Sequence, residues 1–183
     1  MTPLPDTVSA ATDRGVLTLR SADPDGDLDL VHGWMHRAHV VPFWRQDWSV
    51  DRIHAYLADQ YAGDVSRPYV GLLAGVPVSY WEIYRAVAEP VGATYPAESG
   101  DLGVHVLIAD AATTGRGLGR LLLRAVRDAL LDNGSGCDRV VAEPDVRNVA
   151  SVRAFTAAGF RRHADITLPD KTAALMVAER DAP

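Results

Sequence analysis

Apolar and polar positions follow two periods along this 183-residue chain, and the changes of period predict its helices and strands. Apolar residues three and four positions apart predict amphipathic helices over residues 50–61 and 117–131. Two apolar or alternating runs on either side of Gly75 predict an antiparallel hairpin over residues 69–84. The remaining expected elements are, in chain order, a strand at 16–20, a helix ending near Ala38, a mobile loop rich in Pro, Gly and Glu at 86–100, strands at 101–109 and 139–142, a helix at 148–158, and strands at 160–167 and 173–177.

The order of the elements in the second half predicts an α/β fold. The strand at 101–109, the helix at 117–131 and the strand at 139–142 form a β-α-β unit, and the two strands of such a unit run parallel. We expect one domain over residues 16–183, with these parallel strands in the middle of a mixed sheet and helices flanking it. Residues 1–15 contain two prolines and two aspartates without a periodic pattern, and are expected to form a disordered tail.

Composition and charge narrow the functional classes. Hydrophobic residues make up 48% of the chain and no apolar run reaches the length of a membrane span, so a soluble protein without a membrane partner is expected. The first residues have neither a basic start nor an apolar stretch, which argues against a secretory signal. Cys137 is the only cysteine, so we expect neither a disulfide framework nor a thiolate metal cluster, and a cytoplasmic location. The net charge of −6 disfavours a nucleic-acid partner.

A glycine-rich run between a strand and a helix, residues 113–120, is the most informative motif. Its alternate glycines let the backbone turn tightly and present N–H groups, and the helix that follows adds the partial positive charge of its N-terminus. Arg116 and Arg120 can add charge-assisted contacts to phosphate oxygens. We therefore expect a pyrophosphate to bind here, and the structural alternative is a glycine-rich turn with solvated arginines. The glycine spacing is not that of a dinucleotide-binding fingerprint.

The glycine-rich run resembles the acyl-CoA pyrophosphate loop of the GNAT superfamily of N-acyltransferases. Residues 148–155 and the Gly159-Phe160 pair resemble a second signature of that superfamily. The resemblance implies a GNAT fold, in which a largely antiparallel sheet splays open between its two parallel middle strands and the pantetheine arm pairs with the free backbone groups. Thr114 departs from the pattern, which often has Gln or Arg at that position. The acyl-CoA contacts that the resemblance implies are Val106, Leu107, Ile108, Thr114, Gly115, Arg116, Gly117, Leu118, Gly119, Arg120, Asn148, Ser151 and Phe155.

Two residues beside the expected opening are candidates for catalysis. His105 lies inside the first parallel strand, and Asp145 lies just past the end of the second. Attack of a nitrogen on a thioester needs a base that takes a proton, although a strand histidine is often a core residue and an aspartate after proline is often a turn or cap. The strings at 103–108 and 143–148 closely resemble the hydroxamate siderophore acyltransferases. That resemblance implies that Asp145 is the base and that His105 contacts the acceptor.

The N-terminal half contains two segments similar to the substrate side of the same family, residues 34–44 and 80–84. Residues 39–44 are expected to form an aromatic loop closed by Pro42. The spacing of two histidines in the first segment invites a metal, but no third ligand is evident, so we expect no metal site. Glu82 points either into the cleft, toward a cationic end of the acceptor, or to solvent. The acceptor contacts that the resemblance implies are His36, His39, Trp44, Trp81, Glu82, Tyr84 and His105.

These resemblances together imply an N-acyltransferase of hydroxamate siderophore biosynthesis, a pathway of iron acquisition. The acyl group would be acetyl, succinyl or longer, and acetyl-CoA is the expected donor, with an acyl carrier protein as the alternative. The acceptor would be a small amine or hydroxylamine, such as an N-hydroxylated lysine, ornithine or cadaverine. Aminoglycoside 6'-N-acetyltransferases share the aromatic element and a turn like Thr167-Leu-Pro-Asp170, but there we expect an aspartate in place of His105. A non-catalytic acyl-CoA-binding protein is the third interpretation.

Overall fold

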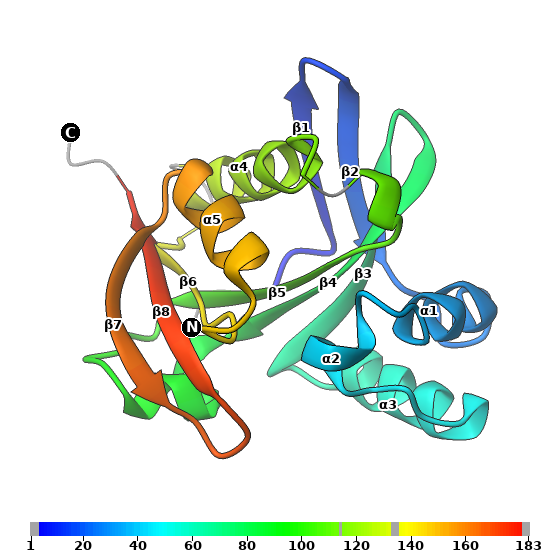
Figure 1. Cartoon of the computed structure of the whole chain (residues 1–183), viewed down its shortest axis with the longest axis horizontal. Coiled ribbons are helices and arrows are strands. Elements are labelled where there is room, and N and C mark those ends of the chain that lie inside the picture. Colours follow the sequence, from blue (N-terminus) through cyan, green and yellow to red (C-terminus); the bar gives the residue numbers. More distant parts are fainter. Residues whose placement is uncertain (1–3, 114, 133–135, 181–183) are drawn as a thin grey trace.

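An eight-stranded mixed sheet forms the centre of the molecule (Figure 1). The computed structural model describes residues 4–113, 115–132 and 136–180, and its strands lie in the order β1-β2-β3-β4-β5-β6-β8-β7. The strands are β1 (Thr7–Thr12), β2 (Gly15–Ser21), β3 (Ser66–Leu73), β4 (Val76–Arg85), β5 (Leu102–Ile108), β6 (Arg139–Ala142), β7 (Arg161–Thr167) and β8 (Thr172–Glu179). The helices are α1 (Leu28–Met35), α2 (Val41–Trp44), α3 (Val50–Ala62), α4 (Leu118–Leu131) and α5 (Val149–Ala157). The predicted α/β architecture, with parallel β5 and β6 inside an otherwise antiparallel sheet, is confirmed.

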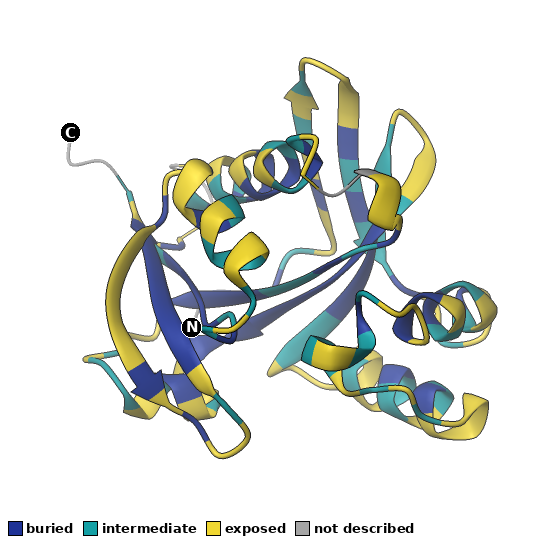
Figure 2. Cartoon of the chain, viewed as in Figure 1, coloured by how far each residue is buried: buried dark blue, intermediate teal, exposed yellow. Residues whose placement is uncertain are grey.

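Helices cover both faces of the sheet, and the alternation of side chains along β4 supplies both cores. Tyr80 packs with buried residues of α1 and α3, whereas its neighbour Trp81 packs with those of α4 and α5 on the other face. Figure 2 shows the central strands as buried, while the helices are buried mainly on the sides that face the sheet. None of the helices in the described ranges has the length and apolarity that crossing a membrane requires.

The parallel strands β5 and β6 stay together for two residue pairs and then separate. Leu102 pairs with Val140 and Gly103 with Val141, and the rest of β5 pairs with β4 alone among the described residues. The chain after β6 stays with β8 instead, because the Pro144 carbonyl accepts from the Ala174 N–H at 2.9 Å. The splay between the middle strands is therefore held open by backbone hydrogen bonds on the β8 side.

The prediction of a disordered tail over residues 1–15 is wrong from Thr7 onward. The strand β1 pairs with β2 in an antiparallel hairpin from Thr7↔Arg20 to Thr12↔Gly15, and Gly15 closes the turn with a φ of +108°. Val8 is buried in the core with the leucines of α4. A short strand of small and polar residues has a weak hydrophobic period, so its pairing with β2 decides its structure. Residues 1–3 lie outside the described part of the chain.

The two expected loops in the first half both contain helical turns. Residues 41–44 form α2, with Pro42 in its first turn, where the fixed φ of proline favours a helix start over the loop closure we expected. The helix ends at Arg45, which has a left-handed φ of +53°. Residues 86–88 and 90–93 form two short 3-10 helices within the stretch expected to be a mobile loop.

Two glycines should respond oppositely to replacement by alanine. A Cβ at Gly103 would lie 2.0 Å from the ring of Tyr84, so Gly103→Ala should lower the free energy of unfolding by about 1–3 kcal/mol. Gly33 lies exposed inside α1 with no atom within 4 Å of its Cβ position, so Gly33→Ala should raise the same quantity by about 0.5–1 kcal/mol. Urea unfolding of both variants measures the difference. A Gly103→Ala protein as stable as the wild type would show that the Tyr84 ring does not lie over Gly103.

Candidate active site

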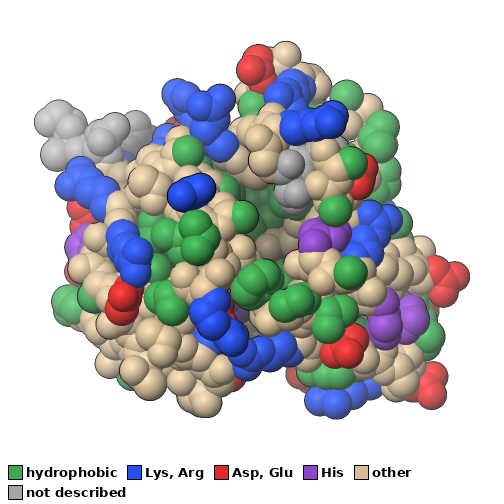
Figure 3. All heavy atoms as spheres, viewed as in Figure 1, with side chains coloured by type: hydrophobic (Ala, Val, Ile, Leu, Met, Phe, Trp, Pro, Cys, Tyr) green, Lys and Arg blue, Asp and Glu red, His purple; other side chains and the backbone are tan. Residues whose placement is uncertain are grey.

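The separation of β5 and β6 opens a cleft of about 240 Å³ in the middle of the sheet. Its walls come from α2 and α3, from β4 and β5, from the segment between β6 and α5, and from the turn between β7 and β8. Figure 3 shows that the surface is hollowed at the centre of this face. The lining residues are Phe43, Trp44, Gln46, Tyr56, Glu82, Val104, His105, Val106, Ala142, Glu143, Pro144, Asp145, Asn148, Ser151, Phe155, Asp170 and Lys171.

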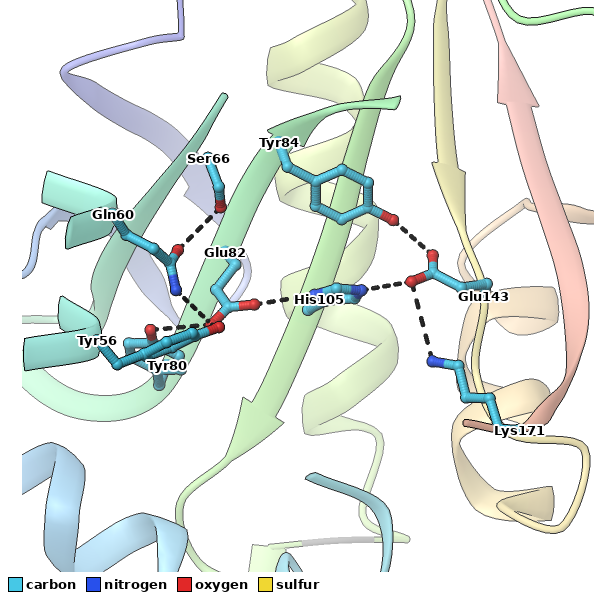
Figure 4. Close-up of polar contacts among 9 residues, drawn as sticks. All are labelled: Tyr56, Gln60, Ser66, Tyr80, Glu82, Tyr84, His105, Glu143 and Lys171. Carbon is cyan, nitrogen blue, oxygen red and sulfur yellow. Dashed lines mark hydrogen bonds and ion pairs between the residues drawn. The ribbon is translucent and has the colours of Figure 1, made fainter. Parts of the chain in front are cut away.

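Three charged side chains form a continuous chain across the cleft: Glu82 on β4, His105 on β5 and Glu143 after β6 (Figure 4). Glu82 and His105 lie opposite each other in the β4–β5 register. The Nδ1 of His105 lies 2.9 Å from Glu82 Oε2, and its Nε2 contacts Glu143 Oε1. Because ionised carboxylates only accept hydrogen bonds, both ring nitrogens donate and the ring is an imidazolium. The side chain of His105 is 36% exposed, so a ligand in the cleft can reach it.

Hydroxyl and amide groups complete the hydrogen bonds of Glu82. The hydroxyls of Tyr56 and Tyr80 donate to its Oε1 at 2.7 and 3.1 Å, and the side-chain amide of Gln60 donates to the same oxygen at 3.1 Å. The hydroxyl of Ser66 donates to the amide oxygen of Gln60 at 2.8 Å and so orients that amide. Glu82 therefore points into the cleft wall rather than to solvent, which settles the direction that the sequence left open.

Two further side chains contact Glu143 (Figure 4). The hydroxyl of Tyr84 donates to its Oε2, and the Nζ of Lys171 lies 3.9 Å from its Oε1. The ring of Tyr84 reaches this position because the opposite residue in β5 is Gly103, which has no side chain to obstruct it. Glu143 is thereby held by three groups from three different strands or turns.

Burial and neighbouring charges act in opposite directions on the pKa values of Glu82, His105 and Glu143. Burial alone would lower the pKa of His105, but Glu143 and Glu82 raise it to about 10. Burial alone would raise the pKa of Glu143, but the charge of His105 lowers it to about 2, and His105 likewise lowers the pKa of Glu82. All three groups are therefore ionised at neutral pH, so His105 is not a free base there.

Asp145 lies at the edge of the same cleft and is held by two arginines. Arg147 binds it as a fork, with Nε 2.9 Å from Oδ1 and Nη2 2.6 Å from Oδ2, and the backbone N–H of Arg147 also donates to Oδ1. The Nη2 of Arg45 lies 3.9 Å from Oδ2. The hydrogen bond from the Arg147 side chain lowers the pKa of Asp145 to about 2, against the effect of burial. Asp145 is consequently an ionised but weakly basic carboxylate at neutral pH.

The glycine-rich run has the backbone that an anion site requires. Gly115 and Gly117 have φ values of +76° and +83°, and Gly117 immediately precedes α4. Arg116 and Arg120 are exposed beside them. The first N–H groups of a helix have no partner within it, so this end of α4 can donate to a pyrophosphate. The expected contact from Thr114 lies outside the described residues.

The second signature lines the cleft from α5, with Asn148, Ser151 and Phe155 among the lining residues. The side chain of Asn148 caps this helix by accepting from the Ser151 N–H at 3.1 Å. Val106 lines the cleft from β5, whereas the side chains of Leu107 and Leu118 are buried in the cores. The side chains of these two leucines therefore do not line the cleft.

The two tryptophans expected at the acceptor occupy different places. Trp44 lines the cleft, and its ring lies edge-on to His105 with centroids 6.2 Å apart. Trp81 is fully buried on the opposite face of β4, where its Nε1 donates to the hydroxyl of Ser79 at 2.8 Å. The expectation that Trp81 contacts the acceptor is wrong, because the alternation along β4 turns it away from the cleft.

The two histidines before α2 also lie outside the cleft lining. The ring of His36 is exposed and lies 4.2 Å from that of His32 between centroids, and the Nε2 of His39 donates to the Ile108 carbonyl at 2.9 Å. His39 thus ties the segment before α2 to the end of β5 and does not contact the acceptor space. Among the described residues, no cluster of three or more His, Cys, Asp or Glu side chains could hold a metal ion.

The structure adds to the site several residues that the sequence did not single out, and among them are Tyr56, Glu143 and Lys171, which contact the Glu82–His105–Glu143 chain or belong to it. Glu143 belongs to the 143–148 string, so its place beside Asp145 was the available signal. Tyr56 reads in the sequence as part of the apolar face of α3, and its hydroxyl gives no sign of a partner 26 residues away. Lys171 is the only lysine of the chain, which is a weak signal without the fold.

Comparisons with known proteins agree with this geometry. The family described as "Acetyltransferase (GNAT) domain" matches residues 23–168. Lysine N-acyltransferase MbtK of Mycobacterium sp. (strain MCS) is 37% identical over 141 residues, which cover 77% of this chain and 58% of that protein. The chain thus spans about three fifths of the length of this relative. N-hydroxyputrescine acetyltransferase of Acinetobacter baumannii is 28% identical over 178 residues, which cover 97% of this chain and 85% of that protein.

A solved structure with a similar fold belongs to an aminoglycoside-modifying protein. The structure of AAC(6')-Ib in complex with paromomycin and acetyl-CoA superimposes with a TM-score of 0.81 at 29% identity, over 90% of this chain and 93% of that one. The extent of the family match and the identity to these relatives establish the family. The chain belongs to the family of GNAT acetyltransferase domains.

Proposed function

We propose that this enzyme transfers an acyl group from acyl-CoA to the nitrogen of a small N-hydroxylated amine, in the biosynthesis of a hydroxamate siderophore. The observation that carries the proposal is the shared cleft, where Asp145 and the Glu82–His105–Glu143 chain face the acyl-CoA signature of α5. Acetyl-CoA is the expected donor. The names of MbtK and of N-hydroxyputrescine acetyltransferase support an amine or hydroxylamine of the lysine or diamine type.

The acyl-CoA side of the proposal rests on two features of the backbone. The end of α4 offers N–H groups and two exposed arginines, Arg116 and Arg120, to a pyrophosphate. Between the β6 pairs and the His39 contact to Ile108, one edge of β5 has no strand partner in the described part of the chain. This edge offers backbone groups to the amides of the pantetheine arm, as an added strand would accept them. An arm bound in both places brings its thioester to the cleft beside His105.

The weak basicity of Asp145 supports a hydroxylamine as the nucleophile. An alkylammonium holds its proton with a pKa of about 10.4. A carboxylate whose own pKa is about 2 is too weak a base to remove that proton well. A hydroxylamine nitrogen is much less basic and arrives largely neutral. Its lone pair attacks the thioester carbon, its N–H becomes acidic as the bond forms, and Asp145 takes that proton while the CoA thiolate leaves.

The role of His105 has to be indirect. Both of its ring nitrogens are already engaged by carboxylates, so the direct contact of a ring nitrogen with the acceptor that the sequence suggested would need one of these bonds to break. We propose that His105 fixes Glu82 and Glu143 in place and that Glu143 meets the hydroxyl of the acceptor. A carboxylate that faces the cleft can accept a hydrogen bond from an N–OH group.

Aminoglycoside 6'-N-acetylation is the second candidate, because AAC(6')-Ib shares the fold. The cleft of about 240 Å³ is smaller than the range of about 300–1,000 Å³ that is typical of sites for drug-sized ligands, which favours a small acceptor.

The purified protein should be given acetyl-, succinyl- and long-chain acyl-CoA and an acyl carrier protein donor. Each donor is combined with hydroxylated and plain diamines, hydroxylated and plain amino acids, or kanamycin as the acceptor. The acylated products are identified by mass spectrometry. We expect acylated hydroxylamines from a CoA donor, and acetylated kanamycin without them would overturn the proposal.

The glycine-rich run provides a test of acyl-CoA binding with a matched control. Gly117→Asp should weaken CoA binding about tenfold or more, because a carboxylate would face the pyrophosphate. The matched control is Gly75→Asp in the β3–β4 turn, which adds the same backbone strain. The φ of Gly75 is +81° and that of Gly117 is +83°, and at neither position would a Cβ have a neighbour within 4 Å, adjacent residues aside, among the residues that the structure describes. Calorimetric titration should show normal affinity for the control. Equal affinity in both folded variants would remove the pyrophosphate assignment.

The role of Asp145 as the base can be separated from a structural role by pH dependence. Asp145→Asn should lower kcat by about 10²–10⁴, the range for loss of a general base. The pKa of Asp145 is about 2 because of Arg147, so Arg147→Gln should raise it. A base acts when deprotonated, so the acidic limb of kcat should then move to higher pH. Two results together would show that another group is the base: an acidic limb of the kcat profile that does not shift in Arg147→Gln, and a near-full kcat in Asp145→Asn.

A further inference from the structure

The only lysine of the chain, which has 18 lysine and arginine residues, lies in the catalytic cleft. Lys171 comes from the turn between β7 and β8, and its side chain is 18% exposed. Its backbone carbonyl accepts from the Leu168 N–H at 2.9 Å, which fixes the turn. The Nζ of Lys171 lies 3.9 Å from Glu143 Oε1, on the side away from Tyr84 (Figure 4).

The three buried carboxylates of the cleft lie beside cations of the protein itself. The buried carboxylates of Glu82 and Glu143 lie in one chain with the cations of His105 and Lys171. The third buried carboxylate of the lining, Asp145, lies between Arg147 and Arg45 and is therefore matched separately. Each buried carboxylate that lines the described cleft thus has a cationic partner already.

We propose that Lys171 is a specificity-determining residue whose ammonium keeps the protonated, non-hydroxylated form of the acceptor out of the cleft. The inference rests on the proposed function, since it concerns the choice between a hydroxylamine and the amine that lacks its hydroxyl. An alkylammonium that approached Glu143 would add a further positive charge beside those of His105 and Lys171, within a few ångströms of Nζ. A neutral hydroxylamine adds no charge, and only its hydroxyl needs a partner.

The consequence appears in binding of the ground state rather than in the chemical step. The nitrogen of both acceptors carries similar charge as it bonds to the thioester carbon, so Lys171 affects the two transition states alike. In the ground state, the reacting nitrogen is an ammonium at neutral pH only in the plain amine. Lys171 should therefore weaken the binding of the plain diamine, which acts as a competitive inhibitor, more than it weakens the binding of the hydroxylated acceptor. Such exclusion matters wherever the hydroxylated acceptor is made from the plain amine, because both are then present together.

The test compares two neutral variants with two controls. Lys171→Met and Lys171→Gln remove the charge, Lys171→Arg keeps it, and Arg162→Met removes a charge from the exposed ion pair of Arg162 with Asp165 on β7. For each folded protein, steady-state kinetics at pH 7 give the KM of a hydroxylated diamine and the Ki of the plain diamine of the same length. We expect the ratio of Ki to KM to fall about tenfold in both neutral variants, an order of magnitude reasonable for one partly buried charge. It should stay near the wild-type value in Lys171→Arg and Arg162→Met.

An unchanged ratio in Lys171→Met and Lys171→Gln would overturn the inference, as would an equal fall in Arg162→Met. The wild type alone separates this failure from that of the proposed function. If it acylates the plain diamine at least as efficiently as the hydroxylated one, the proposed function fails and this inference fails with it. If it prefers the hydroxylated acceptor and both neutral variants keep the ratio, only the role of Lys171 is wrong.

Discussion

The separation of β5 from β6 is the constraint on which the rest of this structure depends. Two parallel pairs hold the strands together, and then the chain after β6 remains hydrogen-bonded to β8, with an isolated bridge between Asp145 and Ala173. One edge of β5 is left without a strand partner among the described residues, and a cleft opens at the middle of the sheet. The separation of β5 from β6 thus leaves backbone groups that need hydrogen-bond partners, and it also opens the cavity that reaches those groups.

The buried charges of the cleft lie next to opposite charges. Removing one partner of a buried ion pair typically costs about 3–5 kcal/mol, since the other charge stays buried without compensation. His105 lies between two carboxylates, and two tyrosine hydroxyls and an amide donate to the remaining oxygen of Glu82. Conversion of the imidazolium to its neutral form would leave these acids less compensated, so its charge is a structural requirement as well as a chemical one. Our proposal accordingly assigns the proton transfer to Asp145, which lies outside the Glu82–His105–Glu143 chain.

The two substrates of the proposed reaction would meet the protein through different kinds of interaction. On the acyl-CoA side the proposed contacts are mainly backbone groups, whose direction is set by strand pairing and by the positive φ of Gly115 and Gly117. On the acceptor side they are side chains whose positions depend on β4, β5 and the β7–β8 turn together. Acceptor choice can consequently change through single side chains, such as Lys171, without altering the fold or the acyl-CoA site.

The sequence by itself determined the features that depend on local order. The β-α-β unit followed from period and connection length, and the tight backbone turn before α4 followed from its alternate glycines. It also placed His105 and Asp145 beside one opening, because the ends of adjacent parallel strands lie close together. Only the tertiary structure decided which way Glu82 and Trp81 point, that residues 7–12 form an edge strand, and that Lys171 reaches Glu143. Those features depend on strand register and on contacts between residues far apart in the chain, whereas a hydrophobic period reports only on near neighbours.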